Sequence, residues 1–226
     1  SGSTLTNTTK TDLVTQLQKY NVASVRPEIV DPETTKILLT SNVKYNAQVT
    51  TKTSTSLKSD VLTTITNYNT NTLSQFDGVF RFSKLSSLID ATDTSILSNI
   101  TTLKIRKDFT PTLGSSTKYN VYFRNALYNP HSGHNSSAGG ILESSGFKIS
   151  GDSSTVFYLD DDGQGNVRRY SFSGSTRVYA NNTQGTIDYA TGAITINSLS
   201  VLSVENIRGA ASTKIELTVV PSSNDV

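Results

Sequence analysis

Residues 36–46 read KILLTSNVKYN, and apolar and polar side chains alternate along most of this segment. The apolar residues that share one parity are Ile37, Leu39, Val43 and Tyr45. A two-residue period predicts a strand with one buried face and one wet face. From Thr53 to Leu73 apolar residues recur at helical spacing, and neither glycine nor proline interrupts them. The two segments predict a strand followed by a long amphipathic helix.

Strand and helix signals continue to alternate up to residue 109. Val79–Phe82 predicts a short strand, Ser83 suits the cap of a second helix, and Ile100–Phe109 alternates as another strand. The order over 36–109 is therefore strand, helix, strand, helix, strand. Such a unit is typical of a small sheet with helices packed on one face.

After Pro111 the helical period disappears. The segments predicted as strands are Tyr119–Tyr128, Thr155–Asp160, Val167–Phe172, Thr186–Tyr189, Ala193–Asn197 and Lys214–Val220. Hairpin turns are expected at Asp161–Asn166 and Ala190–Gly192. The predicted fold class is α+β, a small sheet with helices on one face followed by an all-β module.

Three regions are expected along the chain. Residues 1–29 form an N-terminal segment, residues 30–110 an α+β domain, and residues 111–226 an all-β domain. The opening Ser1-Gly2-Ser3, in a chain without methionine, is typical of an expression scar on a fragment. A short helix is predicted over 11–20, with Thr11 as its cap.

Composition restricts the chemistry that the chain can perform. It has 226 residues, a formal net charge of +2, no Cys and two His. Without Cys there is no thiol nucleophile and no thiolate metal site. No apolar run approaches the roughly 20 residues of a membrane helix, so no membrane contact is expected. The near-neutral charge disfavours nucleic acid as a partner. Basic clusters, expected on solvated strand faces or in ion pairs of an interface, are formed by Lys104, Arg106, Lys107, Arg168 and Arg169.

Two clusters resemble metal sites but lack the required pattern. Asp160–Gly163 begins like a calcium loop, yet Gln164 and Ser171 stand where an EF-hand takes its fifth-position ligand and its final glutamate. A hairpin turn is therefore favoured for this segment. His131 and His134 lie in a glycine-rich loop without an adjacent carboxylate, which favours a contact surface over a metal site.

No catalytic constellation is visible. Gly133–Gly140 lacks the Lys-Ser or Lys-Thr that closes a phosphate loop, and no serine stands in Gly-x-Ser-x-Gly. Asp90 and Asp93 follow a short helix, where Asp93 suits the N-cap of a turn at Ser95–Leu97 better than acid–base chemistry. We therefore expect no catalytic, cofactor-binding or metal-binding residue, no cofactor and no enzymatic activity.

Several stretches together resemble a known family. They are Val30–Glu33, Ile37–Asn46 with the helix after it, Phe80–Leu85, Leu88–Asp93, Ser95–Asn99 and Gly185–Ile196. In this order they resemble the C-terminal part of phage baseplate wedge proteins, the baseplate J-like family. The likeness is closest to the T-even type of contractile-tailed phage.

The resemblance implies a virion structural protein of the tail baseplate, assembled in the host cytoplasm and without an active site. It also implies pairing with a second copy and contacts with other baseplate wedge proteins. Strand edges in the C-terminal module are expected to allow a homodimer, because low charge on the strands, as in Thr186–Ile196, leaves little repulsion to prevent the contact.

Two other functions remain open at this point. The first is a carbohydrate- or receptor-binding tail module, with sugar-stacking faces supplied by Tyr119, Tyr122, Tyr128 and Tyr158. The second is a polysaccharide hydrolase, which needs a carboxylate pair in a cleft that no motif marks.

Overall fold

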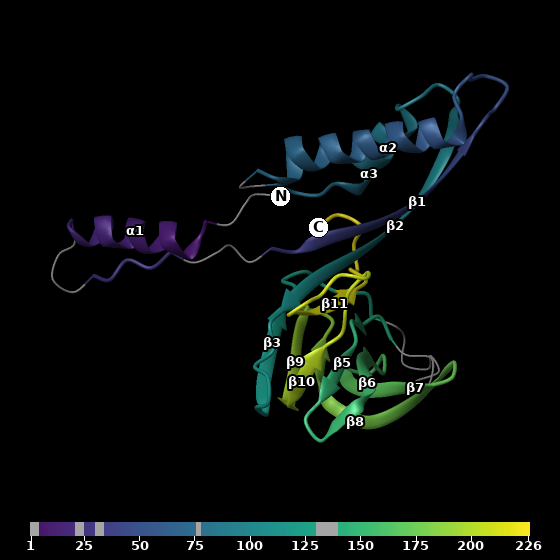
Figure 1. Cartoon of the computed structure of the whole chain (residues 1–226). Coiled ribbons are helices and arrows are strands. Elements are labelled where there is room, and N and C mark those ends of the chain that lie inside the picture. Colours follow the sequence, from purple (N-terminus) through teal and green to yellow (C-terminus); the bar gives the residue numbers. More distant parts are fainter. Residues whose placement is uncertain (1–4, 21–24, 30–33, 76–77, 130–139) are drawn as a thin grey trace.

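The protein is described by a computed structural model that covers residues 5–20, 25–29, 34–75, 78–129 and 140–226. Within these ranges the chain is an α+β fold with a large β-module, which confirms the predicted fold class (Figure 1). The helices are α1 (Asn7–Gln18), α2 (Ser54–Tyr68) with a π-helical turn over Asn69–Leu73, and α3 (Phe82–Asp90).

The strands form two antiparallel sheets. Sheet A has the order β1-β2-β11-β4, and sheet B has the order β10-β5-β6-β7-β8-β9-β3. Sheet A consists of β1 (Lys36–Tyr45), β2 (Ile96–Phe109), β11 (Ile215–Val219) and β4 (Glu143–Ser144). Sheet B consists of β3 (Thr117–Tyr122), β5 (Phe147–Ile149), β6 (Asp152–Asp161), β7 (Asn166–Ser173), β8 (Thr176–Asp188), β9 (Ala193–Leu199) and β10 (Val201–Val204).

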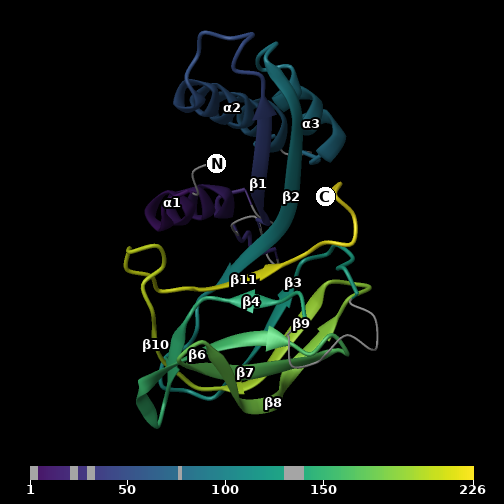
Figure 2. The same ribbon diagram turned by 90° about the vertical axis from the view of Figure 1, so that its right-hand side faces the viewer.

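Helices α2 and α3, which lie between β1 and β2 in the chain, cover one face of this antiparallel strand pair, as the alternation of apolar residues predicted. The register places Leu39 opposite Leu103, so both side chains point to the helices. Val61 of α2 and Ile89 of α3 belong, with Leu103, to this first cluster of buried residues. Figure 2 shows α2 on the β1 side of the strand pair and α3 on the β2 side.

A second, larger core lies between the two sheets. Ile105 and Leu217 contribute to it from sheet A, and Leu159 and Ile194 contribute from sheet B. The long strand β2 takes part in both cores, because Leu103 belongs to the first cluster and Ile105 to the second. The division of the chain at residues 110–111 stays a prediction; sheet A contains strands from both sides of it, since β11 pairs with β2.

The short strand predicted over Val79–Phe82 is wrong. Phe82 is already the first residue of α3, and Arg81 rather than Ser83 holds the cap position. Phe80 instead exchanges two backbone hydrogen bonds with Val226, at 2.8 and 3.1 Å. The alternation of Phe80 and Phe82 therefore reflects one point of contact with the end of the chain rather than a strand.

The weakly charged segment Thr186–Ile196 lies in the interior of sheet B. Its strands β8 and β9 lie inside sheet B, each paired on both sides. Gly185 permits this close pairing, because a Cβ there would lie 1.9 Å from the carbonyl oxygen of Thr195. Gly192 forms the turn between the strands with a φ of +70°, a conformation that favours glycine. A second copy could therefore pair with the backbone of these strands only if the sheet opened, so a dimer through paired strands would need another strand edge.

Other predicted elements are shifted at their ends. The N-terminal helix begins at Asn7, where Thr6 rather than Thr11 caps it by accepting a hydrogen bond from the Thr9 N–H at 3.2 Å. The strand predicted over Tyr119–Tyr128 occupies Thr117–Tyr122. The short strands β4, β5 and β10 were missed, because two to four residues are too few for a period to be read.

Candidate assembly surfaces

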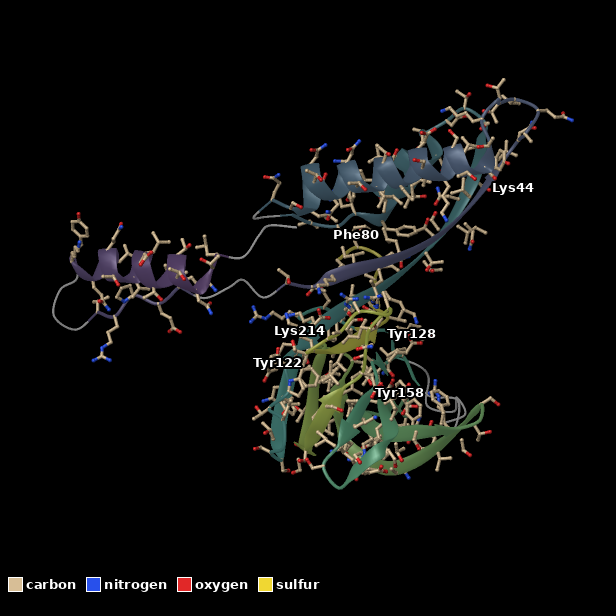
Figure 3. The ribbon with its side chains drawn as sticks, viewed as in Figure 1. Lys44, Phe80, Tyr122, Tyr128, Tyr158 and Lys214 are labelled. Atoms are coloured by element: carbon tan, nitrogen blue, oxygen red, sulfur yellow. The ribbon has the colours of Figure 1, made fainter. Side chains whose placement is uncertain are left out.

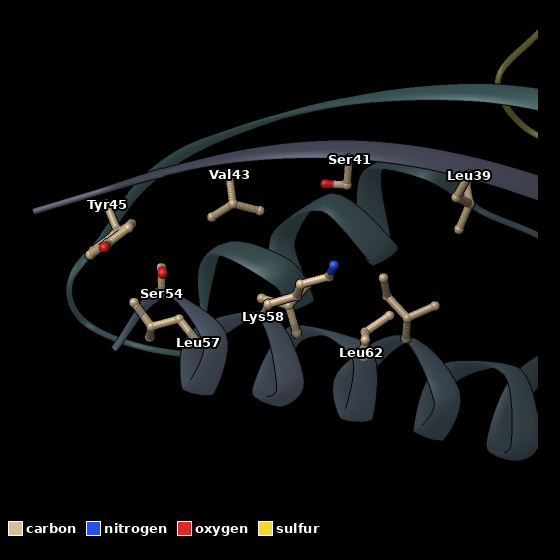
Figure 4. Close-up of a pocket in the computed structure, with 10 residues that line it drawn as sticks. Leu39, Ser41, Val43, Tyr45, Ser54, Leu57, Lys58 and Leu62 are labelled. Carbon is tan, nitrogen blue, oxygen red and sulfur yellow. The ribbon is translucent and has the colours of Figure 1, made fainter. Parts of the chain in front are cut away.

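An open groove of about 320 Å³ runs between β1 and α2 (Figure 4). Its lining is mostly apolar, with Lys58 as its one charged side chain. The lining residues are Leu39, Ser41, Val43 and Tyr45 of β1, and Ser54, Leu57, Lys58, Val61, Leu62 and Ile65 of α2. Each β1 residue in this group belongs to the face that the alternation in the sequence marked as the buried one.

The groove is open because α2 covers β1 incompletely. Leu39 and Val43 are only half-buried, whereas their neighbour Leu103 on β2 is buried under the helices. Leu62, on the open side of α2, leaves 53% of its surface exposed. Apolar side chains that line a cleft and remain partly wet are a common feature of protein contact surfaces.

The strand beside the groove is an edge strand. Among the described strands β1 pairs with β2 alone, along its whole length from Lys36 to Tyr45. The other side of its backbone therefore presents N–H and C=O groups to which another strand can bind. Lys36 and Lys44 stand at its two ends, and Lys36 forms an ion pair with Asp108.

An ion-pair network ties the loop after β1 to α2 and to the turn before β2. Lys52 Nζ lies 2.9 Å from carboxylate oxygens of both Asp60 and Asp93. These hydrogen bonds, first that of Asp93, raise the pKa of Lys52 to about 12. The hydrogen bond from Lys52, with further bonds from Ser95, lowers the pKa of Asp93 to about 2. The network fixes the loop that leads from β1 into the first turn of α2.

A cluster of aromatic residues, here called the aromatic cluster, forms a second surface on strands β6, β7 and β8. It consists of Tyr158, Tyr170, Phe172 and Tyr179. Neighbouring ring centroids lie 5.4–5.8 Å apart, within the range of favourable aromatic pairs. Phe172 is 48% exposed. The guanidinium of Arg177 lies 4.7 Å above the ring of Tyr170.

Asp160 fixes the base of the aromatic cluster. It accepts hydrogen bonds from Arg168 Nε at 3.0 Å and Nη2 at 3.1 Å, from Arg177 Nη1 at 2.7 Å and from the Tyr179 hydroxyl at 3.0 Å. The carboxylate is buried, so the two arginines compensate its charge. Sequence reasoning missed this pair, although the hairpin register that places Asp160 opposite Arg168 is visible from the turn between them.

The rest of the run Asp160–Gly163 forms the hairpin turn that was expected. Asp161 accepts hydrogen bonds from the Leu142 N–H at 2.7 Å and the Tyr189 hydroxyl at 2.5 Å. Burial and the bond to Asp161 raise the pKa of Tyr189 far above its ordinary value. Asp162 accepts bonds from the N–H groups of Gln164 and Asn166 at 2.8 and 3.0 Å. The carboxylates of Asp161 and Asp162, which a calcium loop would use as ligands, thus accept hydrogen bonds from the protein itself.

Asp90 and Asp93, the acids considered for acid–base chemistry, also form local hydrogen bonds. Asp93 caps a turn as predicted, because it accepts hydrogen bonds from Ser95 N–H and Oγ at 2.9 and 2.7 Å, but this turn ends where β2 begins at Ile96. Asp90 accepts a bond from Asn99 Nδ2 at 2.7 Å. His131, His134 and nearly all of Gly133–Gly140 lie outside the described residues.

The basic residues do not form a single patch. Lys104 pairs with Glu143 at 2.8 Å, and Arg106 pairs with Glu216 at 2.9 Å. Arg169 donates to Gln184 at 2.9 Å. Lys107 is buried. The clusters that are contiguous in sequence are therefore dispersed over sheet A and sheet B as ion pairs and polar contacts.

The tyrosines named from the sequence do not meet in one platform. Tyr119 packs against Phe109 at 4.8 Å, and its hydroxyl accepts a hydrogen bond from the Thr112 N–H. Tyr122, Tyr128 and Tyr158 lie on separate parts of the β-module (Figure 3). Of the four, only Tyr158 belongs to the aromatic cluster.

The model of one protein family matches residues 36–108, about a third of the chain. Its description is baseplate structural protein gp6, C-terminal domain III. The match supports a structural role in a phage baseplate and a location in the virion tail. The matched residues contain β1, α2, α3 and nearly all of β2, and hence the groove and the free edge.

No curated protein matches the chain. None of the helices in the described ranges has the length and hydropathy of a membrane-spanning segment.

Proposed function

We propose that this chain is a wedge subunit of the baseplate of a contractile phage tail, and that it works by self-association and by contacts with other baseplate proteins rather than by catalysis. The observation that carries the proposal is the match of residues 36–108 to a baseplate structural domain. Assembly of the subunit in the host cytoplasm, before it joins the virion, belongs to the same proposal.

Two surface features support an assembly role. The groove and the free edge of β1 lie in the matched region, and the aromatic cluster lies on the β-module. Tyrosine, phenylalanine and arginine are enriched at the centres of protein interfaces, where they form pre-organised contact points. In the aromatic cluster, Asp160 and the two arginines bound to it hold the rings in place before any partner arrives.

We place self-association on the aromatic cluster, as a two-fold contact between the sheet faces of two copies. Closed two-fold pairing is the commonest way in which copies of one chain meet. Phe172 is half exposed and stands beside Tyr158 and Tyr170, so it is the side chain whose burial the dimer would gain. A specific interface of this kind buries at least about 1,000 Å² in total.

Sedimentation equilibrium over a wide concentration range tests this proposal. The expected result is a mass that rises from 24.4 kDa toward twice that value, and a Phe172→Ala variant that stays closer to 24.4 kDa. Tyr122→Ala is the matched control, because Tyr122 is 47% exposed but lies on β3. A mass that stays at 24.4 kDa at every concentration would contradict self-association of this chain.

The aromatic cluster also favours a second candidate, a carbohydrate- or receptor-binding tail module. The exposed ring of Phe172 is able to stack against a sugar ring, and Arg177, which lies opposite it on β8, is able to donate hydrogen bonds to the sugar. A glycan array separates the two functions. Binding of a defined glycan that Phe172→Ala abolishes and Tyr122→Ala leaves unchanged would favour this second candidate.

A further inference from the structure

We infer that the free edge of β1 and the groove beside it accept an extended strand from another protein, which joins sheet A and carries alternating apolar and acidic residues. The inference rests on the proposed function in one respect, that the chain works through contacts with other proteins. It goes beyond that function by naming the site and the chemistry of the partner.

The backbone of β1 supplies the first part of the site. The strand is ten residues long. It pairs with β2 in an unbroken register from Lys36 to Lys44, and the register shifts only between Lys44 and Tyr45. Among the described strands no other one pairs with its outer side. An incoming strand would form main-chain hydrogen bonds along this side, as in other cases of strand addition to a sheet edge.

The groove supplies the second part. Successive residues of a strand point to opposite faces, so every second side chain of an added strand would point toward α2. On that face Leu39 and Val43 of β1 are half-buried, and Leu62 of α2 is 53% exposed. Apolar side chains from the partner would fill the groove of about 320 Å³ and remove these surfaces from water. The groove therefore selects an alternating apolar pattern.

The charges beside the edge select the other residues of the partner. The charged residues on β1 and in the groove lining are Lys36, Lys44 and Lys58, and none of the residues there is acidic. Lys36 is compensated by Asp108 and Lys58 lines the groove on the α2 side, so Lys44 is the charge on the face to which the other side chains of the partner would point. An acidic side chain on the partner strand would complement Lys44.

The edge strand of a second copy does not fit the same site. In two-fold antiparallel pairing of β1 with itself, both α2 helices would lie on one face of the joined sheet. Neighbouring strands are about 4.8 Å apart, whereas packed helices need about 8–10 Å between their axes. Because α2 already stands on the outer side of β1, a second α2 would collide with it (Figure 2). A strand without a helix above it avoids this collision.

The test uses a synthetic peptide of ten residues in which valine alternates with glutamate. The expected result is saturable binding to the whole chain, measured by fluorescence anisotropy, with slower hydrogen exchange at the β1 amides and no change at the β3 amides. Two N-methylated forms, one modified on two valine amides and one on two glutamate amides, sharpen the test. Only alternate amides face β1, so one form is expected to bind and the other to fail.

Variants of the chain test the groove. Leu62→Glu is expected to weaken peptide binding at least about tenfold, since it places a charge where apolar side chains should pack. Leu88→Glu on α3 is the matched control, because Leu88 is also an exposed leucine but lies outside the groove. Both positions are on the surface, so each variant is expected to fold, and circular dichroism checks this. A peptide with lysine in place of glutamate is expected to bind at least about tenfold more weakly.

Each outcome decides the inference. Failure of the valine–glutamate peptide to bind, equal binding of both N-methylated forms, or equal binding to both leucine variants would overturn it. Equal binding of the lysine peptide would overturn the acidic part. Protection of the β1 amides at high protein concentration without peptide would assign the edge to a second copy instead. Sedimentation of the chain alone tests self-association separately, so failure of one proposal is distinguishable from failure of the other.

Discussion

Asp160 shows how a single residue on the sheet surface organises its neighbours. Its side chain is 2% exposed and binds Arg168 through two nitrogen atoms, and Arg177 and Tyr179 add further bonds. A buried carboxylate is tolerated only when opposite charges and hydrogen bonds replace its water shell. Removing the carboxylate would leave the Arg168 guanidinium, which is 7% exposed, without its compensating charge.

We therefore expect Asp160→Asn to lower the free energy of unfolding by about 3–5 kcal/mol. Urea unfolding followed by circular dichroism measures the change. Asp12→Asn is the control, because α1 contains no buried residue, and its effect is expected to stay within about 0.5 kcal/mol. A loss below about 1 kcal/mol for Asp160→Asn would mean that water replaces the lost charge, as at exposed ion pairs.

At the scale of elements, the loop between β1 and α2 depends on ionisable groups. Lys52 in this loop bridges Asp60 of α2 and Asp93 in the turn before β2. The pKa of Asp93 is lowered from 3.8 to about 2, so its contribution to stability is fully present above pH 3.8 and is lost as the pH falls toward about 2. The pKa of Lys52 is raised from 10.5 to about 12, so its contribution is lost only as the pH rises through that range.

The Lys52→Gln variant tests this ion pair. We expect the wild-type chain to have the higher urea midpoint between pH 3.8 and 10.5, and the difference between the two proteins to shrink as the pH falls from 3.8 to about 2. Urea unfolding of both proteins as a function of pH measures this. Lys58→Gln, on α2 but outside this network, controls for the general effect of removing a lysine. A difference that does not depend on pH would rule out the ion pair as its cause.

At the scale of the whole molecule, the end of the chain connects the two cores. Val226 packs against both clusters of buried residues, and its backbone bonds to Phe80. The side chain of Asp225 accepts a hydrogen bond from the Phe82 N–H at 2.8 Å, at the start of α3. Asp225 thus satisfies a helix N–H that no residue of α3 itself can bind.

Removal of Asp225 and Val226 is expected to speed hydrogen exchange in α3 at least about tenfold, because a lost helix cap alone costs about 1 kcal/mol and the apolar contact adds to it. Exchange in β6–β8, which lie in sheet B, is expected to change little. Hydrogen exchange with mass spectrometry measures both regions in one experiment. Asn224→Ala, an exposed change in the same segment, should leave both rates unaltered. Faster exchange in both regions alike would mean that the two cores unfold as one unit.

The sequence by itself determined the elements whose pattern is local. The alternation in residues 36–46 and the helical period after Thr53 gave β1 and α2 nearly at their observed bounds, because side-chain period depends on neighbouring residues alone. The turns at Asp161–Asn166 and Ala190–Gly192 were found for the same reason, since their glycine and polar residues permit the required backbone. Resemblance, rather than period, pointed to a phage baseplate.

The tertiary structure alone decided which distant residues meet. Examples are the pairing of β11 with β2, the contact of Phe80 with Val226 and the place of β8 and β9 inside sheet B. In each case no pattern in the sequence of one segment indicates the other segment as its partner. The open groove arises in the same way, from how far α2 leaves β1 uncovered. Period shows that a side chain is buried, but the partner that buries it is chosen by the packing of the whole chain.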